Sequence, residues 1–184
     1  MLTLHFDYTS PASALAVLRL QQLADRGADV EFIGIDALGL EVAVPATLDQ
    51  LDELERFAPR ARQLGLVMHR PRLRPPTLSA HLVAGLAQRC DLGAAWRRAV
   101  LEGYWTRGLD LSRDEVLVEF AGGIGLSREQ VGRWLADRAR RIELRQTMTA
   151  ERGRGVGGVP VLEFEGAFVS ADLDDDDLGR LAAL

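Results

Sequence analysis

The chain has very little cysteine and no lysine. Of its 184 residues only Cys90 is a cysteine, so an internal disulfide and a Cys-x-x-Cys redox pair are both excluded. All 22 basic residues are arginine, which fits a GC-rich genome and carries no functional conclusion. Long apolar runs are absent too, since none approaches the roughly 20 residues that span a bilayer. Residues 1–4 lead straight into a strand without a basic leader, so we expect a cytoplasmic protein with no membrane partner.

The charge balance excludes other classes of partner and site. The net charge is -5, so no general attraction to nucleic acid is expected. His5, His69 and His81 lie far apart in the sequence, and none pairs with Cys90 at metal-binding spacing, so we expect no metal site. The hydrophobic fraction of 47% is typical of a globular protein, and this length suffices for one core or for one core with an inserted subdomain.

The first forty residues predict a strand, a helix and a second strand. Residues 3–8 alternate in polarity as a strand does. Apolar residues then recur at helical spacing over residues 11–26, and Gly27 is placed to end that helix. Residues 29–36, "DVEFIGID", carry the branched apolar side chains of a second strand. A βαβ unit of this kind indicates a parallel strand pair.

The middle of the chain is predicted to be helical almost throughout. Capping boxes at Ser112 and Ser127 mark two of the helix starts. Pro59 is expected to interrupt the first helix or to begin a new one. The expected helices cover residues 48–66, 77–90, 93–107, 112–121, 127–136 and 137–151.

The last thirty residues return to strands. Residues 159–163 and 167–169 flank a Glu165-Gly166 turn, which is typical of a β-hairpin, and an acidic helix follows. The order βαβ, helical block, ββα predicts an α/β protein with a thioredoxin-like fold and a large all-helical insertion. We expect residues 1–46 and 153–184 to form the thioredoxin-like domain and residues 47–152 to form the insertion.

Two short motifs in this order resemble the DsbA family of thioredoxin-like proteins. "DYTSPASALA" is similar to the Ser-Pro motif that replaces the redox cysteines in 2-hydroxychromene-2-carboxylate isomerases and kappa-class glutathione transferases, and "VGGVPV" matches the stretch before their late hairpin. The resemblance implies a glutathione- or other thiol-dependent isomerase or transferase that acts on a small unsaturated or electrophilic acid. It also implies a homodimer.

The Ser-Pro motif has a structural and a functional reading. Ser10 is a good N-cap and Pro11 suits the first helical position, which explains the dipeptide without any ligand. The same free amides and helix dipole also favour an anion, so a bound thiolate could accept a hydrogen bond from Ser10, the expected catalytic residue.

The resemblance supplies the remaining cofactor-binding residues. It implies that the Val159-Pro160 bond is cis and that the main chain of Val159 pairs with a peptide-like thiol. The family's Gly-Ser-Asp-Arg stretch corresponds to residues 170–173, where Asp172 alone matches and would bind the amino end of glutathione. Capping of the last helix is the alternative role of Asp172.

Several positions depart from the family pattern. Ala12 replaces an aromatic residue, Pro76 stands where an asparagine is common, and Leu173 replaces the arginine after Asp172. The alternative hypothesis is therefore a non-catalytic protein that kept the fold and binds a ligand or peptide. Thiol-disulfide exchange is disfavoured, because the chain has no cysteine pair.

Other polar and aromatic residues have simpler interpretations. A core or surface role is favoured for His81 over a role in a pocket, and a buried apolar role is favoured for Cys90. An arginine patch near the proline-rich connector is interpreted as a solvated face, with attraction of an anionic substrate as the alternative: Arg60, Arg62, Arg70, Arg72 and Arg74. The aromatic residues of the insertion are expected in its core: Trp96, Tyr104, Trp105, Phe120 and Trp134.

Overall fold

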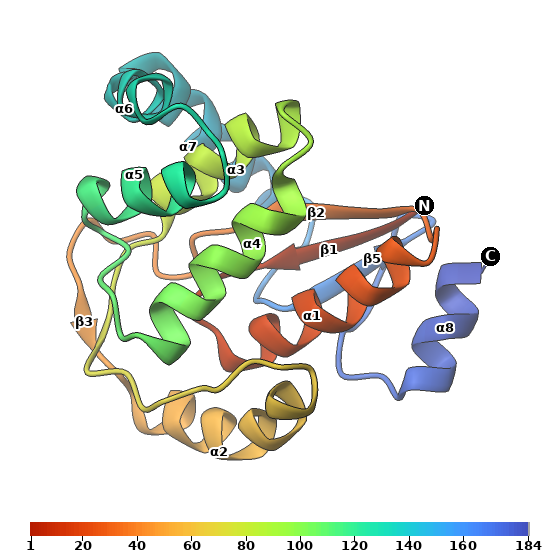
Figure 1. The fold of residues 1–184 in the computed structure, drawn as a ribbon. Coiled ribbons are helices and arrows are strands. Elements are labelled where there is room, and N and C mark those ends of the chain that lie inside the picture. The colour runs from red at the N-terminus through yellow and green to blue at the C-terminus, as the bar shows by residue number, and fades with distance from the viewer. Residues whose placement is uncertain (184) are drawn as a thin grey trace.

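The computed structural model describes residues 1–183, and its chain folds as a mixed sheet with helices around it (Figure 1). The strands are β1 Leu2–Phe6, β2 Val30–Gly34, β3 Val44–Pro45, β4 Leu73–Arg74, β5 Val161–Phe164 and β6 Ala167–Ser170. The helices are α1 Pro11–Asp25, α2 Leu48–Gln63, α3 Leu78–Arg89, α4 Gly93–Leu101, the π-helical turn η1 Glu102–Thr106, α5 Asp114–Gly123, α6 Arg128–Ala136, α7 Arg138–Gly153 and α8 Asp175–Ala183. The α/β fold and the thioredoxin-like order predicted from the sequence are confirmed.

The main sheet has the strand order β2-β1-β5-β6. β1 runs parallel to β2, as the βαβ unit predicts, and antiparallel to β5. β5 and β6 form the predicted hairpin, whose two turn residues Glu165 and Gly166 both have positive φ. The central strand β1 is buried along its whole length, so its two faces must both be covered.

Helices cover both faces of this sheet. Leu2, Leu4 and Phe6 belong to the same buried apolar cluster as the inner face of α1, and this cluster continues into the helices of the insertion. A second cluster brings Met148 of α7 against Val161 and other apolar residues of the sheet. Among residues 1–183, no helix combines the length and the apolar character that crossing a bilayer requires.

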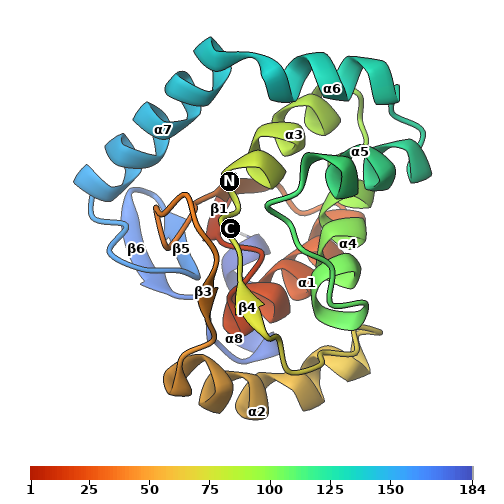
Figure 2. The ribbon, with the colours of Figure 1, turned by 90° about the vertical axis from the view of Figure 1, so that its left-hand side faces the viewer.

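The insertion differs from the prediction in three details. Pro59 lies inside a continuous α2 rather than at a break. The helix expected over residues 93–107 changes to π geometry at Glu102. The two-residue strand β4 pairs with β3, which the sequence pattern did not indicate because ladders this short leave no periodicity (Figure 2).

One of the two predicted capping boxes is wrong. Ser127 caps α6 as expected, because its Oγ accepts a hydrogen bond from Gln130 N at 3.3 Å. The hydroxyl of Ser112 instead donates to Asp110 Oδ1 at 2.7 Å, and α5 begins only at Asp114. An aspartate two residues upstream competes for the serine, and such local side-chain bonds favour a turn over a helix start.

Candidate functional site

Ser10 is the N-cap of α1. Its Oγ accepts a hydrogen bond from Ser13 N at 3.1 Å, its backbone is extended, and Pro11 follows at the first helical position. A hydroxyl accepts and also donates, so this bond leaves the Ser10 proton free. Within residues 1–183 no group accepts that proton. Ser10 is only 6% exposed, so a partner for the proton would be largely shielded from water.

Three distant segments hold the turn that leads into Ser10. Trp105 Nε1 donates to the carbonyl of Tyr8 at 2.9 Å, and Gln50 Nε2 donates to the carbonyl of Thr9 at 2.7 Å. Arg74 Nε donates to the Thr9 hydroxyl at 3.0 Å. Both turn residues are fully buried, so the position of the α1 N-terminus is fixed by α2, β4 and the π-helical turn.

Asp7 lies beneath this turn at the end of β1. Its carboxylate accepts hydrogen bonds from Thr9 N at 3.3 Å and from Ala37 N at 2.9 Å. Arg74 Nη2 lies at 3.5 Å and His81 Nε2 at 3.9 Å from its oxygens. Burial alone would raise the pKa of Asp7, but the neighbouring imidazole, amide and guanidinium outweigh it and hold the pKa below its usual value.

Sequence reasoning missed Asp7 as a site residue. The available signal was an acidic residue between the aromatic residues Phe6 and Tyr8 at the end of a predicted strand, since a buried carboxylate needs partners. The structure also shows His81 buried and stacked on Tyr8 with ring centroids 4.7 Å apart, in line with the favoured core reading. Nearby Asp36 has a raised pKa, because it is buried and because the Asp7 carboxylate repels its charge.

The predicted cofactor-binding residues lie at the same end of the sheet as Ser10. The Val159-Pro160 bond is cis, as expected. The β1–β5 register ends at His5↔Val161, so Val159 and Pro160 directly precede β5 at the end of the sheet where β1 leads into Asp7. The β5–β6 register pairs Val161 with Ser170, so Asp172 follows β6 at the same end. The roles of these residues in binding remain predictions.

Asp172 has other partners in the structure. Arg56 Nη2 contacts its Oδ2, and Arg60 Nη1 lies 3.2 Å from its Oδ1. The alternative of a helix cap is wrong, because Asp174 accepts the capping bond of α8 from Asp177 N at 2.7 Å. Asp172 therefore links the end of the hairpin to α2.

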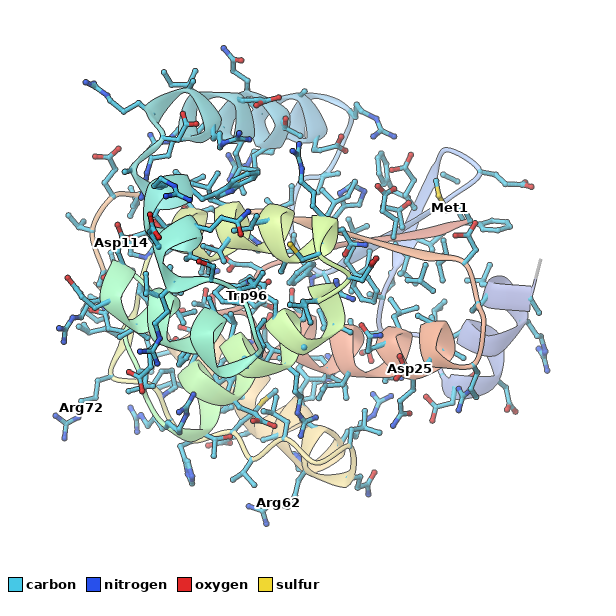
Figure 3. All side chains as sticks on the ribbon, turned by 45° about the horizontal axis from the view of Figure 1, so that its top comes forward. Met1, Asp25, Arg62, Arg72, Trp96 and Asp114 are labelled. Atoms are coloured by element: carbon cyan, nitrogen blue, oxygen red, sulfur yellow. The ribbon has the colours of Figure 1, made fainter. Side chains whose placement is uncertain are left out.

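The arginine patch divides into inward and outward members. Arg74 turns in toward the α1 turn and Arg60 pairs with Asp172, whereas Arg62 and Arg72 extend from the surface (Figure 3). The predicted solvated face thus holds for only part of the patch, because β4 directs Arg74 toward Thr9.

The remaining predictions concern the aromatic residues of the insertion and the thiol of Cys90. The insertion aromatics are buried or partly buried, as expected, and Trp96 lies deep in the molecule (Figure 3). Cys90 is exposed, so its predicted buried role is wrong. The residue is the C-cap of α3, where the helix ends and the side chain meets solvent.

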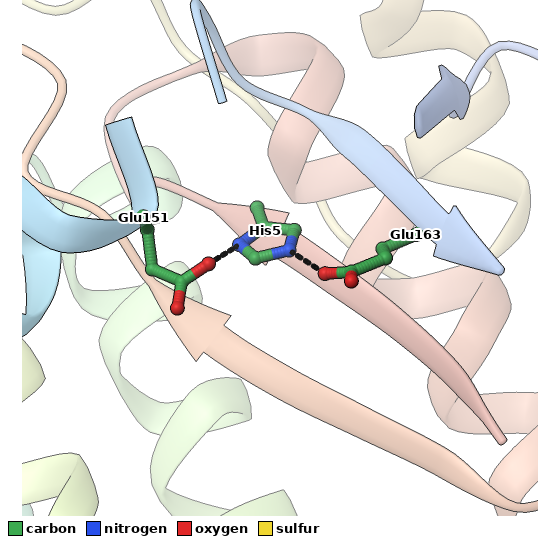
Figure 4. Close-up of side chains that lie close together, drawn as sticks. All are labelled: His5, Glu151 and Glu163. Atoms are coloured by element: carbon green, nitrogen blue, oxygen red, sulfur yellow. Dashed lines mark hydrogen bonds and ion pairs between the residues drawn. The ribbon is translucent and has the colours of Figure 1, made fainter. Parts of the chain in front are cut away.

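His5 brings two glutamates together on the α7 side of the sheet. Its Nε2 lies 3.1 Å from Glu163 Oε2 and its Nδ1 lies 3.8 Å from Glu151 Oε2, on opposite sides of the ring (Figure 4). These three residues could in principle ligate a metal ion. Arg154 donates to both carboxylates and already supplies a cation there. The cluster is therefore best described as an ion-pair network that joins β1, β5 and α7.

Comparisons with solved structures show which fold this is. A probable DsbA oxidoreductase from Streptomyces coelicolor is 21% identical with a TM-score of 0.83, over 99% of this chain and 88% of that one. A 2-hydroxychromene-2-carboxylate isomerase is 22% identical with a TM-score of 0.78, over 99% and 92%. The cytosolic disulfide reductase DsbM from Pseudomonas aeruginosa, solved with GSH, is 18% identical with a TM-score of 0.65, over 99% and 95%.

The family follows from a sequence comparison. A search of curated protein sequences found no significant match. A profile of the DSBA-like thioredoxin domain, however, matches residues 1–179, which is nearly the whole chain. The chain therefore belongs to the DSBA-like thioredoxin domain family.

Proposed function

We propose that the protein is a thiol-dependent isomerase or transferase that uses glutathione, or another low-molecular-weight thiol, on a small unsaturated or electrophilic acid. The observation that carries this proposal is the hydroxyl of Ser10, whose proton is free at the N-terminus of α1. The chain has no cysteine at this position, and its one thiol is the exposed Cys90. The reactive sulfur therefore comes from the ligand.

The site favours sulfur in its ionised form. A thiol with a pKa of about 8.5 is only a few per cent thiolate at neutral pH. Lowering the pKa by about two units makes it mostly thiolate and requires about 2.7 kcal/mol. One charge-assisted hydrogen bond from Ser10, together with the helix dipole, is of that size. A bound thiol supplies a sulfur nucleophile that can add reversibly to a conjugated double bond.

Two groups at the same end of the sheet as Ser10 are suited to the two ends of such a thiol. The backbone of Val159 lies at the same end of the sheet and can pair with a peptide-like ligand. The group of Arg56, Arg60 and Asp172 carries a net positive charge, because two guanidinium groups share one carboxylate. It is therefore suited to a carboxylate of glutathione rather than to its ammonium group, which changes the role expected for Asp172.

Two structural relatives support the proposed chemistry. One is named as an isomerase and another was solved with GSH, and both share the fold over nearly their full length. Ala12 leaves the site without the aromatic wall of the family motif, so we place the substrate against the buried Thr9–Ser10 turn and its nearby cation Arg74.

A thermal-shift titration tests the proposal with a matched control. Glutathione at about 100 times its dissociation constant should stabilise the protein by about 2.7 kcal/mol. For a chain of this size the melting temperature should rise by about 5–11 °C. Ser10→Ala and Ser127→Ala each remove one N-cap hydroxyl, at a cost of about 1 kcal/mol.

Only Ser10→Ala should lose the response to glutathione, because Ser127 caps the remote helix α6. Equal responses in the two variants would show that the hydroxyl does not contact the thiol. If neither glutathione nor other cellular thiols shift the wild type, the cofactor proposal is wrong, and the non-catalytic binding protein becomes the better hypothesis.

A further inference from the structure

The outer strand β2 presents unpaired backbone groups along one edge. Leu2 N donates to Asp29 O, and Ile35 N donates to Phe6 O, each at 2.9 Å or less. In a parallel pair, alternate residues of a strand bond to the same neighbour. The odd-numbered residues of β2 therefore face β1, and the N–H and C=O groups of Val30, Phe32 and Gly34 point away from it. Within residues 1–183 these outward groups have no other partner.

A groove of about 520 Å³ runs along this edge. All five residues of β2 line it, and α3 and α7 form its opposite wall with Ala84, Gly85, Leu144 and Thr147. His81 closes one end of the groove, because its ring packs directly against Gly34 and leaves no room for a side chain there. The volume of the groove lies within the range of ordinary ligand sites. The end opposite His81 is where an extended peptide could enter and reach the edge of β2.

Arg97 places a positive charge in this groove. Its guanidinium lies 3.8 Å above the ring of Phe32, and its Nη2 donates to the neutral Gln21 Oε1 at 2.6 Å. Within the described chain Arg97 has no carboxylate within 4.0 Å, and its Nε is buried without a partner. Burial lowers the pKa of Arg97, and the more distant charge of Asp25 offsets this only in part. An anionic group in the groove would supply the missing partner.

We propose that the β2 groove binds an extended acidic peptide, which adds as a strand to Val30 and Phe32 and directs a carboxylate to Arg97. Main-chain hydrogen bonds give this mode its affinity, and the pocket on one side gives its specificity. The lining of the groove includes neither Ser10 nor Val159, but Tyr8 and His81 belong both to the groove and to the surroundings of the Ser10 turn. The peptide proposal does not use the Ser10 hydroxyl and is therefore tested separately from the thiol chemistry.

Fluorescence anisotropy with a rhodamine-labelled Val-Glu-Val-Glu-Val peptide tests the proposal on the full-length protein. We expect saturable binding below about 1 mM. A peptide with glutamine in place of both glutamates should bind at least about tenfold more weakly. The glutamate peptide should likewise bind at least about tenfold more weakly to the Arg97→Gln protein. Val30→Pro removes one outward N–H without breaking the β1 ladder and should weaken binding about three- to tenfold.

A blocking variant has a matched control in the same chain. Gly85 lies in α3 and Gly132 in α6, and a side chain added at either meets no atom within 4 Å. Gly85→Leu should fill the groove and abolish peptide binding, whereas Gly132→Leu should leave it unchanged. Ser10→Ala should also bind normally.

Three outcomes would overturn the proposal. These are no saturable binding at about 1 mM peptide, equal binding of the glutamine peptide, and full binding by Gly85→Leu. Analytical ultracentrifugation adds a fourth outcome: if Gly85→Leu converts a dimer to a monomer, the β2 edge is occupied by a second copy of the chain rather than by a peptide.

Discussion

Removing the charge of Asp7 should destabilise the fold in a pH-dependent way. Asp7→Asn keeps the size of the side chain and one acceptor oxygen. The new amide nitrogen, however, faces either Ala37 N–H and Arg74 or Thr9 N–H, all of which are donors. Removing one partner of a buried ion pair costs about 3–5 kcal/mol. Arg74 is 19% exposed and can regain some hydration, so we expect about 3 kcal/mol at neutral pH.

The loss should shrink on acidification. The pKa of Asp7 is lowered in the folded protein, so its stabilising contribution is complete above the unfolded-chain value of about 3.9. That contribution disappears as the pH falls through the lower folded-state value, and asparagine has none to lose. Urea denaturation at pH 7 and at successive pH values below about 4 measures the difference between the two proteins.

An exposed aspartate provides the control for this experiment. Asp177 pairs with Arg180 at 3.0 Å, and its side chain is 51% exposed. Asp177→Asn should therefore cost no more than about 1 kcal/mol. A cost below about 1 kcal/mol for Asp7→Asn at pH 7, or a cost that stays constant in acid, would refute the view that Asp7 holds the turn as a charged group.

Three further predictions follow from single contacts. Burial and the charge of Asp7 raise the pKa of Asp36 in the folded protein. Its contribution to folding stability is therefore complete below the unfolded-chain pKa and is lost as the pH rises through the folded-state pKa. Asp36→Asn should thus raise the free energy of unfolding at pH 7, measured by urea denaturation. Trp105→Phe leaves the buried carbonyl of Tyr8 without its donor and should cost about 1–3 kcal/mol by the same assay. Cys90 should react with a thiol reagent in the native protein, and Cys90→Ala should leave the glutathione-induced thermal shift unchanged.

The sequence predicted those parts of the fold that depend on local patterns. The βαβ unit, the late hairpin and the caps at Ser10 and Ser127 all lie in short segments whose own residues specify them. Ser112 shows the limit of this reasoning. Residues 112–115 match the capping-box motif, yet the bond that Ser112 makes instead is to Asp110, which lies outside the motif.

The polar surroundings of Ser10 could not be predicted in the same way. Asp7 follows β1, whereas Arg74 and His81 lie in β4 and α3, and only the tertiary fold brings these segments together. Asp172 was identified from the family motif, but its two arginine partners lie on α2, more than 100 residues earlier in the sequence. Spacing along the chain carries no information about such contacts.

The state of the sulfur when a thiol is bound tests the central claim most directly. The thiolate absorbs in the ultraviolet and the thiol does not, so a pH titration of glutathione at saturating protein reports its pKa in the complex. We expect a value about two units below the free value of about 8.5 with wild type and with Ser127→Ala, and a clearly smaller shift with Ser10→Ala, which keeps the helix dipole but loses the hydrogen bond. A bound thiol whose pKa stays near its free value, or shifts equally in Ser10→Ala, would contradict the proposal that Ser10 and the N-terminus of α1 stabilise a borrowed thiolate.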